Sequence, residues 1–131
     1  MTTTDLIIIG AGPGGYHTAG YAAKHGLQVV IIEKGELGGT CLNVGCIPTK
    51  SFAHDADLYR NPLVPKSENG IDFKPILERK NQVVAQLVSG IGTLLSQPGI
   101  TLVKGEAHFV DAHTVEVGGE QYTAKNILIA T

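Results

Sequence analysis

A glycine-rich turn directly after a short apolar run is the feature that most constrains how this chain can fold. The run, residues 6–9 (LIII), has the length and composition of a strand buried on both faces of a sheet. The turn, residues 10–15 (GAGPGG), fits the pattern G-x-G-x-x-G, which is informative when it joins a strand to a helix. The order of these segments therefore predicts an α/β fold with a central parallel strand.

The next segments extend this start into a βαβ unit. Residues 14–25 predict a helix with several small alanines for close packing, and Gly26 is a natural residue to end it. Residues 27–32 are a second apolar strand, which ends at Glu33. A strand, helix and strand in this order are parallel and right-handed by strong precedent.

The rest of the chain predicts a Rossmann-like parallel sheet flanked by helices, with a small antiparallel β-meander. We expect the parallel strands in the order 101–103, 28–33, 5–9, 126–130, with the long helix packed on one face. The remaining predicted elements are a helix over 41–59 that is irregular near Gly45 and Pro48, an exposed loop over 61–70, a long amphipathic helix from about Asp72, and meander strands over 107–110, 114–117 and 121–123.

Composition excludes several classes of protein. The 131 residues suit one domain, and the formal net charge of −2 gives no reason to expect nucleic acid or an anionic membrane surface as a partner. No apolar run near the start is long enough to span a bilayer, and the first five residues carry no cationic segment of a secretory signal. We therefore expect a soluble cytoplasmic protein.

The glycines predict a dinucleotide site at the start of the first helix. Such glycines allow a tight turn, a close approach of backbone to pyrophosphate, and close helix–strand packing. Glu33 lies 18 positions after Gly15, where a carboxylate can accept hydrogen bonds from a ribose. A solvated strand-end acid is the alternative for Glu33. Spacing does not separate FAD from NAD, although the carboxylate argues against NADP. The candidate binding residues of the turn are Gly10, Gly12, Gly14 and Gly15.

The only two cysteines, Cys41 and Cys46, lie five positions apart in residues 38–50 (GGTCLNVGCIPTK). A disulfide needs Cα atoms about 4.4–6.8 Å apart, closer than an ideal helix allows here, so bridging requires a distorted turn that Gly45 can supply. Such a bridge should be easily reduced. Beside a redox cofactor, the pair therefore predicts electron exchange with that cofactor.

Three other uses of the two thiols compete with the redox interpretation. Zinc needs about four ligands and only His54 lies nearby, so we expect no metal site. Two inert buried thiols and a purely structural disulfide are the remaining alternatives. Lys50 would share the helix face of Cys46 and could stabilise a thiolate, although a solvated lysine is the alternative reading of that position.

Taken together, these motifs resemble a known family. The glycine turn, Glu33-Lys34, residues 38–50 and residues 126–131 look like the N-terminal part of a pyridine nucleotide–disulfide oxidoreductase. The form of the cysteine motif is most similar to the dihydrolipoyl dehydrogenase branch of that family. The resemblance implies that residues 1–131 are the N-terminal part of a FAD-binding domain, without the NAD and dimerisation domains that family members carry downstream.

The resemblance also implies a role for each candidate residue. FAD would be the cofactor, with Glu33 on the adenosine ribose. Cys41 would be the interchange thiol that meets the substrate, and Cys46 the thiol that faces the flavin. The other implied cofactor contacts are Lys34 near the ribose, Gly39 and Thr40 on the pyrophosphate and flavin side, Lys50 beside the isoalloxazine, Ala107 near the adenine, and Thr131 near the cofactor.

By resemblance, the intact enzyme would be a homodimer that oxidises dihydrolipoyl groups on the lipoyl-carrying subunit of a 2-oxo acid dehydrogenase or glycine cleavage complex. Electrons would pass through Cys41–Cys46 and FAD to NAD⁺. The 131 residues alone lack the hydride acceptor and the catalytic base, since none of the five histidines has the required context, so we expect no turnover. Alternatives are a glutathione-type or mercuric reductase, and a non-catalytic flavin- or nucleotide-binding fragment.

Overall fold

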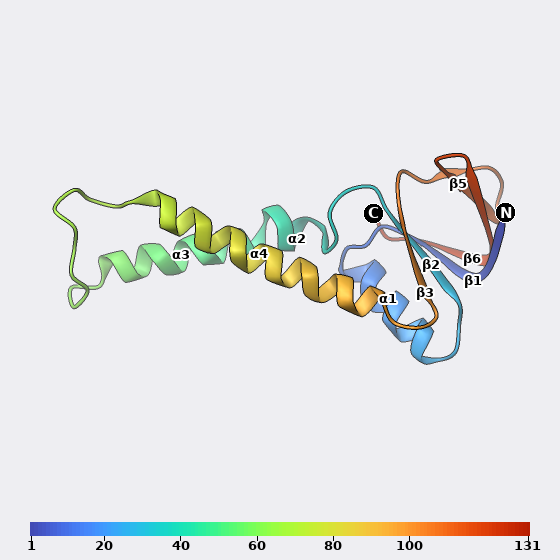
Figure 1. Ribbon diagram of the computed structural model, residues 1–131, viewed down its shortest axis with the longest axis horizontal. Helices are drawn as coiled ribbons and strands as arrows, with labels where there is room; N and C mark the ends of the chain where they lie inside the picture. The colour runs from blue at the N-terminus through green and yellow to red at the C-terminus, as the bar shows by residue number, and fades with distance from the viewer.

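The computed structural model describes residues 1–131 as one six-stranded sheet with four helices (Figure 1). The strands lie in the order β3-β2-β1-β6-β5-β4, parallel from β3 to β6 and antiparallel from β6 to β4. The predicted α/β class and the predicted order of the four parallel strands are confirmed. The elements are β1 (Thr2–Ile9), α1 (Pro13–Lys24), β2 (Val29–Glu33), α2 (Gly39–Val44), α3 (Cys46–Arg60), α4 (Phe73–Leu95), β3 (Ile100–Lys104), β4 (His108–Phe109), β5 (Thr114–Val117) and β6 (Glu120–Ile129).

Successive residues of β1 build the core on opposite faces of the sheet, because side chains alternate along a strand. Ile8 packs with Ile31 of β2 on the face that is covered by α1 and the last turns of α4. Ile7 packs with Ile32 and Tyr122 on the other face, under the meander strands. All four isoleucines are buried, and burial of such a side chain contributes about 1.5–3 kcal/mol. The two cores together hold the carboxyl ends of the parallel strands in place.

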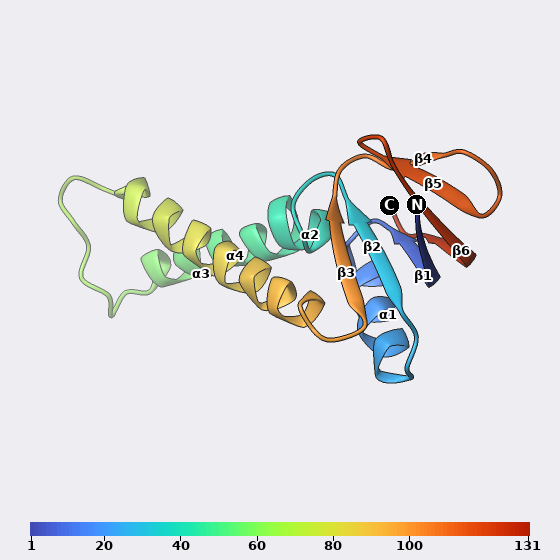
Figure 2. The same ribbon diagram turned by 45° about the vertical axis from the view of Figure 1, so that its right-hand side comes forward.

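Helices α3 and α4 form a hairpin that projects away from the sheet (Figures 1 and 2). Helix α3 buries only Pro48 and Ser51, and α4 buries only Ile91 and Leu95 near its C-terminal end. The prediction that the long helix packs on one face of the sheet is therefore right only for its last turns. The rest of α4 lies beside α3.

Two predicted boundaries are wrong. The helix expected over residues 41–59, irregular near Gly45 and Pro48, is two helices: the irregularity at Gly45 is a complete break, with φ and ψ of −123° and −110°. The two strands expected over residues 121–123 and 126–130 are one strand, β6. Its length follows from β1, which pairs with β6 along nearly its whole length.

No helix of the structure combines the length and the hydrophobicity that a membrane crossing requires.

Candidate cofactor and disulfide site

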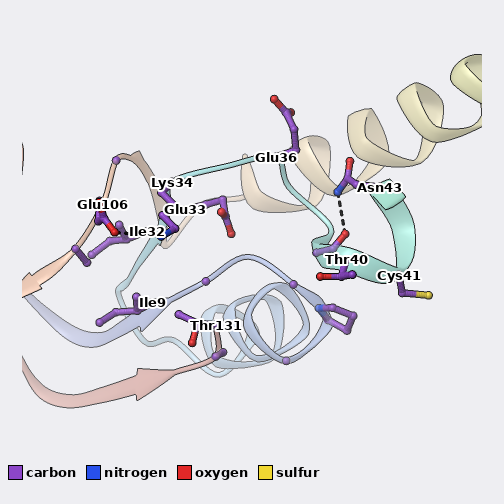
Figure 3. Close-up of a pocket in the computed structure, with 18 of the residues that line it drawn as sticks. Ile9, Ile32, Glu33, Lys34, Glu36, Thr40, Cys41, Asn43, Glu106 and Thr131 are labelled. Atoms are coloured by element: carbon purple, nitrogen blue, oxygen red, sulfur yellow. Dashed lines mark hydrogen bonds and ion pairs between the residues drawn. The ribbon is translucent and has the colours of Figure 1, made fainter. Parts of the chain in front are cut away.

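A cavity of about 930 Å³ opens where β1, β2 and β6 end, beside the N-terminus of α1 (Figure 3). Ligands of open α/β sheets bind at this edge, outside the carboxyl ends of the strands. Figure 3 shows Glu33, Lys34 and Glu106 at one end of the cavity and Thr40, Asn43 and Cys41 at the other. Ten of the residues predicted from the sequence line it: Gly10, Gly12, Gly14, Glu33, Lys34, Gly39, Thr40, Cys41, Ala107 and Thr131.

The glycine turn presents free backbone donors to this cavity. Gly10 has a φ of +103°, and a side chain there would overlap the carbonyl oxygen of Ala130, so only glycine fits. Helix α1 starts at Pro13, and the N–H groups of Gly12 and Gly14 donate no hydrogen bond within the protein. Free N–H groups and the helix dipole favour an anion at a helix N-terminus. The turn can therefore bind a phosphate group.

Glu33 accepts hydrogen bonds from backbone N–H groups of two different segments, the glycine turn and the residues that follow β2. Its Oε2 accepts a hydrogen bond from the N–H of Ala11 at 2.7 Å, and its Oε1 accepts one from the N–H of Gly35 at 2.7 Å. The Glu33 side chain is half-buried, and these two bonds fix its position. The alternative interpretation of Glu33, a solvated acid at the end of a strand, therefore does not fit. Each carboxylate oxygen has a second lone pair, so Glu33 can still accept a hydrogen bond from a ligand hydroxyl.

A charged pair lies at the same end of the cavity. Lys34 Nζ is 3.1 Å from Glu106 Oε1, and both side chains are mostly exposed. The hydrogen bond and charge of Lys34, together with the charge of His108, lower the pKa of Glu106 below its ordinary value of 4.5. Because the pair is exposed, it contributes little to stability. Its effect is to keep the rim of the cavity charged.

Asn43 links the wall of the cavity to the cysteine segment. Its Nδ2 donates to the carbonyl oxygen of Leu37 at 2.9 Å and to that of Gly39 at 3.0 Å. The same loop is tied to the glycine turn, because Gly38 N–H donates to the carbonyl oxygen of Ala11 at 2.9 Å. Continuous hydrogen bonds thus run from the glycine turn through this loop to α2, the helix that contains Cys41.

Cys41 and Cys46 form a disulfide, with their Cα atoms 4.7 Å apart. The break at Gly45 permits it, since this residue ends α2 and starts α3. A Cβ at Gly45 would lie 3.1 Å from both Cys41 Cα and Thr40 O, a tight fit. Both cysteines are exposed, so a dissolved thiol can reach the bridge.

Three predicted site residues lie outside the cavity wall. Gly15 is buried against the turn, Cys46 lies at the start of α3, and Lys50 is exposed one helical turn further along α3. The structure thus brings Cys41, and not Cys46, into the cavity wall. Sequence reasoning missed three polar wall residues, Glu36, Asn43 and Glu106. Other wall residues that it did not assign are Ile9, Pro13, Ile32, Val44, Gly105 and Ala130.

Comparisons with known proteins agree with this geometry. Residues 4–131 match the family model described as pyridine nucleotide-disulphide oxidoreductase. Curated relatives named dihydrolipoyl dehydrogenase include one from Geobacillus stearothermophilus, 46% identical over 98% of this chain, and one from Mycoplasma pneumoniae, 43% identical over 97%. This chain spans 29% of the length of each.

Solved structures give the same result for the fold. The Cu(II) complex of the HOCl-induced flavoprotein disulfide reductase RclA from Escherichia coli matches all of this chain, and 29% of its own, with a TM-score of 0.87 and 34% identity. A second structure of the same reductase from Escherichia coli matches 97% of this chain with a TM-score of 0.84 and 35% identity. With the family model covering nearly every residue, this chain belongs to the pyridine nucleotide-disulphide oxidoreductase family.

Proposed function

We propose that residues 1–131 form the FAD-binding and disulfide-carrying part of a dihydrolipoyl dehydrogenase. The observation that carries the proposal is that Cys41 lies in the wall of the cavity formed by the glycine turn and is bonded to Cys46. A redox-active sulfur and a phosphate-binding turn thus share one cavity. The identity of 46% to the dehydrogenase from Geobacillus stearothermophilus supports this branch of the family.

The residues of the cavity fit FAD. Proteins of this family carry FAD in their N-terminal domain. The free N–H groups of Gly12 and Gly14 suit its pyrophosphate, and Glu33 suits the adenosine ribose. A Cβ at Gly39 would lie 3.0 Å from Gly12 Cα, so glycine at position 39 lets the loop before Cys41 pack directly against the glycine turn. Gly10, Lys34, Thr40, Ala107 and Thr131 complete the contacts we propose, with Lys50 at the flavin.

The chemistry of the chain itself is thiol–disulfide exchange. One thiolate of a substrate dithiol attacks Cys41 Sγ, the Cys41–Cys46 bond breaks, and its electron pair leaves on Cys46 Sγ. The second substrate thiolate then attacks the substrate sulfur of this mixed disulfide, which forms the cyclic disulfide and releases Cys41. The substrate is oxidised by two electrons, its two protons pass to solvent or to the new thiols, and the pair is reduced. Bound FAD would supply the acceptor for those two electrons.

The intact enzyme, on this proposal, is a homodimer that passes electrons to NAD⁺ and acts on the lipoyl-carrying subunit of a 2-oxo acid dehydrogenase or glycine cleavage complex. The curated relatives are more than three times as long as this chain, and their remaining length would supply the NAD site and the catalytic base. We therefore expect the 131 residues alone to be inactive in turnover. NADH formation from dihydrolipoamide and NAD⁺ by the purified chain would contradict this.

An absorption spectrum tests the proposal directly. The purified chain is incubated with FAD, desalted, and scanned before and after one equivalent of dihydrolipoamide without oxygen. We expect a retained flavin spectrum and, after reduction, a long-wavelength band from a thiolate in contact with the flavin. A chain that stays colourless after desalting would refute FAD binding. Glutathione as the reductant tests the alternative substrate class.

Single serine variants assign the two thiols. If Cys46 faces the flavin, Cys41→Ser keeps the thiolate contact and shows the long-wavelength band without reduction, whereas Cys46→Ser lacks it. The opposite result would assign the flavin-facing role to Cys41, which is the cysteine in the cavity wall. Both variants lose the disulfide, so each is the control for the other.

A further inference from the structure

Helix α3 carries Cys46 and Lys50 but has little apolar anchorage. Of its 15 residues, only Pro48 and Ser51 are buried. At its N-terminal end, the disulfide joins it to α2. When that disulfide opens, as the proposed function requires, only the backbone of residues 42–45 still joins the two cysteines. Contacts from elsewhere in the protein then decide whether α3 keeps the Cys46 thiol close to that of Cys41.

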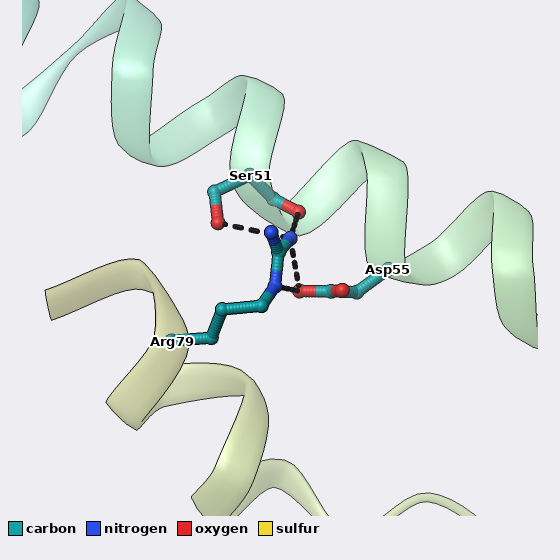
Figure 4. A network of polar contacts seen from close by, with 3 residues as sticks. All are labelled: Ser51, Asp55 and Arg79. Atoms are coloured by element: carbon teal, nitrogen blue, oxygen red, sulfur yellow. Dashed lines mark hydrogen bonds and ion pairs between the residues drawn. The ribbon is translucent and has the colours of Figure 1, made fainter. Parts of the chain in front are cut away.

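Arg79 supplies such contacts from α4 (Figure 4). Its Nη2 donates to the carbonyl oxygen of Ser51 at 3.0 Å, to Ser51 Oγ at 3.3 Å and to Asp55 Oδ2 at 2.9 Å. Its Nε donates to the same Asp55 oxygen at 3.3 Å. The Asp55 side chain is only 12% exposed. Hydrogen bonds between charged groups are about twice as strong as neutral ones, and a largely buried carboxylate depends on its partner.

The other end of α4 fixes Arg79 relative to the sheet. Ile91 and Leu95 of the same continuous helix are buried in the core beside Ile8 and Ile31. Ser51 in turn lies five positions after Cys46 on α3. The network therefore connects the sheet, through α4, to the helix that begins with Cys46. A second α3–α4 contact joins the rings of Phe52 and Phe73 at 5.6 Å, but Phe73 is the first residue of α4 and is half-exposed.

We propose that Arg79 is a positioning residue that keeps Cys46 within bonding distance of Cys41 when the disulfide is reduced. The inference rests on the redox function proposed above. If α3 stays in place in the dithiol state, the effective concentration of the Cys46 thiol at Cys41 stays high. The Arg79 network therefore favours the disulfide over the dithiol. By linkage, the disulfide favours the network to the same extent.

The equilibrium between the chain and dithiothreitol measures this coupling. Dithiothreitol loses two electrons and two protons and forms a ring disulfide, while the Cys41–Cys46 bond breaks and both sulfurs become thiols. Mass spectrometry after alkylation gives the fraction of dithiol. We expect Arg79→Met to lower the equilibrium constant for the protein disulfide about tenfold, which raises its potential by about 30 mV. Arg79→Lys should shift the equilibrium constant less. An ammonium group can pair with Asp55, but it lacks the planar set of donors with which the guanidinium binds Asp55 and Ser51 together.

Lys80→Met is the matched control, since it removes a cation from the next position of α4, where the side chain bonds only to Asn81. Its equilibrium constant should stay within about twofold of wild type, well below a coupling of typical size. If the equilibrium constant of Arg79→Met also stays within that range, the inference is overturned. A purely structural role of Arg79 would destabilise both redox states equally and leave the constant unchanged. If circular dichroism shows that Arg79→Met does not fold, Arg79→Lys and Asp55→Asn are judged by the same criterion. A wild-type disulfide that dithiothreitol cannot open refutes the redox function itself, a result distinct from an unchanged constant.

Discussion

The α-carbon of Gly15 lies directly against the carbonyl oxygen of Gly10, with no room for a side chain between them. We predict that Gly15→Ala destabilises the fold by about 1–3 kcal/mol, because the added methyl pushes α1 away from the turn. Gly14→Ala is the control, since its Cβ would lie at an ordinary 3.7 Å from Ala130 Cβ. Urea denaturation without cofactor measures both variants, and equal stabilities would contradict the close approach.

Glu33 should matter for folding as well as for binding. Glu33→Gln places an NH₂ group against one of the two backbone N–H donors, so one hydrogen bond is lost and a donor is left unpaired. We expect a loss of about 1–3 kcal/mol in the free energy of unfolding without cofactor. Glu36→Gln is the control, because Glu36 lines the same cavity but accepts no hydrogen bond. A similar loss in both variants would argue against the backbone bonds of Glu33.

The break between α2 and α3 should require glycine. In Gly45→Ala, the new methyl would lie 3.1 Å from Cys41 Cα and from Thr40 O, so the two helices must move apart. We expect a larger fraction of free thiol at a fixed ratio of oxidised to reduced dithiothreitol, measured by alkylation. Gly90→Ala, where a Cβ meets no atom within 4 Å, should leave that fraction unchanged. An unchanged fraction in Gly45→Ala would show that the break does not depend on glycine.

Tyr122 predicts a pH dependence at the alkaline end. Its hydroxyl donates to Glu120 Oε2 at 2.8 Å, and this bond, together with burial, raises the pKa of Tyr122 above 10.0. The folded state holds the phenol proton more tightly than the unfolded state does. The resulting contribution of Tyr122 to the free energy of unfolding is therefore fully present below pH 10 and is lost as the pH rises through the pKa of the folded state. Stability to urea should therefore fall above pH 10, and less steeply in Tyr122→Phe. Parallel pH curves for the two proteins would contradict this.

The strand order could be predicted because each parallel strand has its own local signal. Residues 6–9 and 29–32 are nearly pure branched aliphatics, and the glycine turn identifies which strand is central. The disulfide could also be predicted, since the chain has only two cysteines and Gly45 lies between them. These features depend on residues close together in the sequence.

The errors and omissions depend on partners far away in the sequence. The continuity of β6 is set by pairing with β1, which is more than 110 positions earlier. The projection of α4 away from the sheet depends on its position beside α3, where Arg79 bonds to Ser51 and Asp55 more than 20 positions earlier, and periodicity alone does not reveal this. Glu106 pairs with Lys34 across 72 positions. Asn43 had only a weak signal, a polar residue between the two cysteines and close to two successive glycines.

The peptide groups on both sides of Ala11 are each held by a hydrogen bond to a different segment of the chain. Glu33 binds the N–H of Ala11, and Gly38 donates to its carbonyl oxygen. Since a peptide group is planar and trans, a fixed carbonyl of Ala11 also fixes the direction of the free N–H of Gly12. This donor cannot rotate away when the cavity is empty. A phosphate that arrives there meets a donor that folding has already oriented, so little conformational entropy remains to be lost on binding.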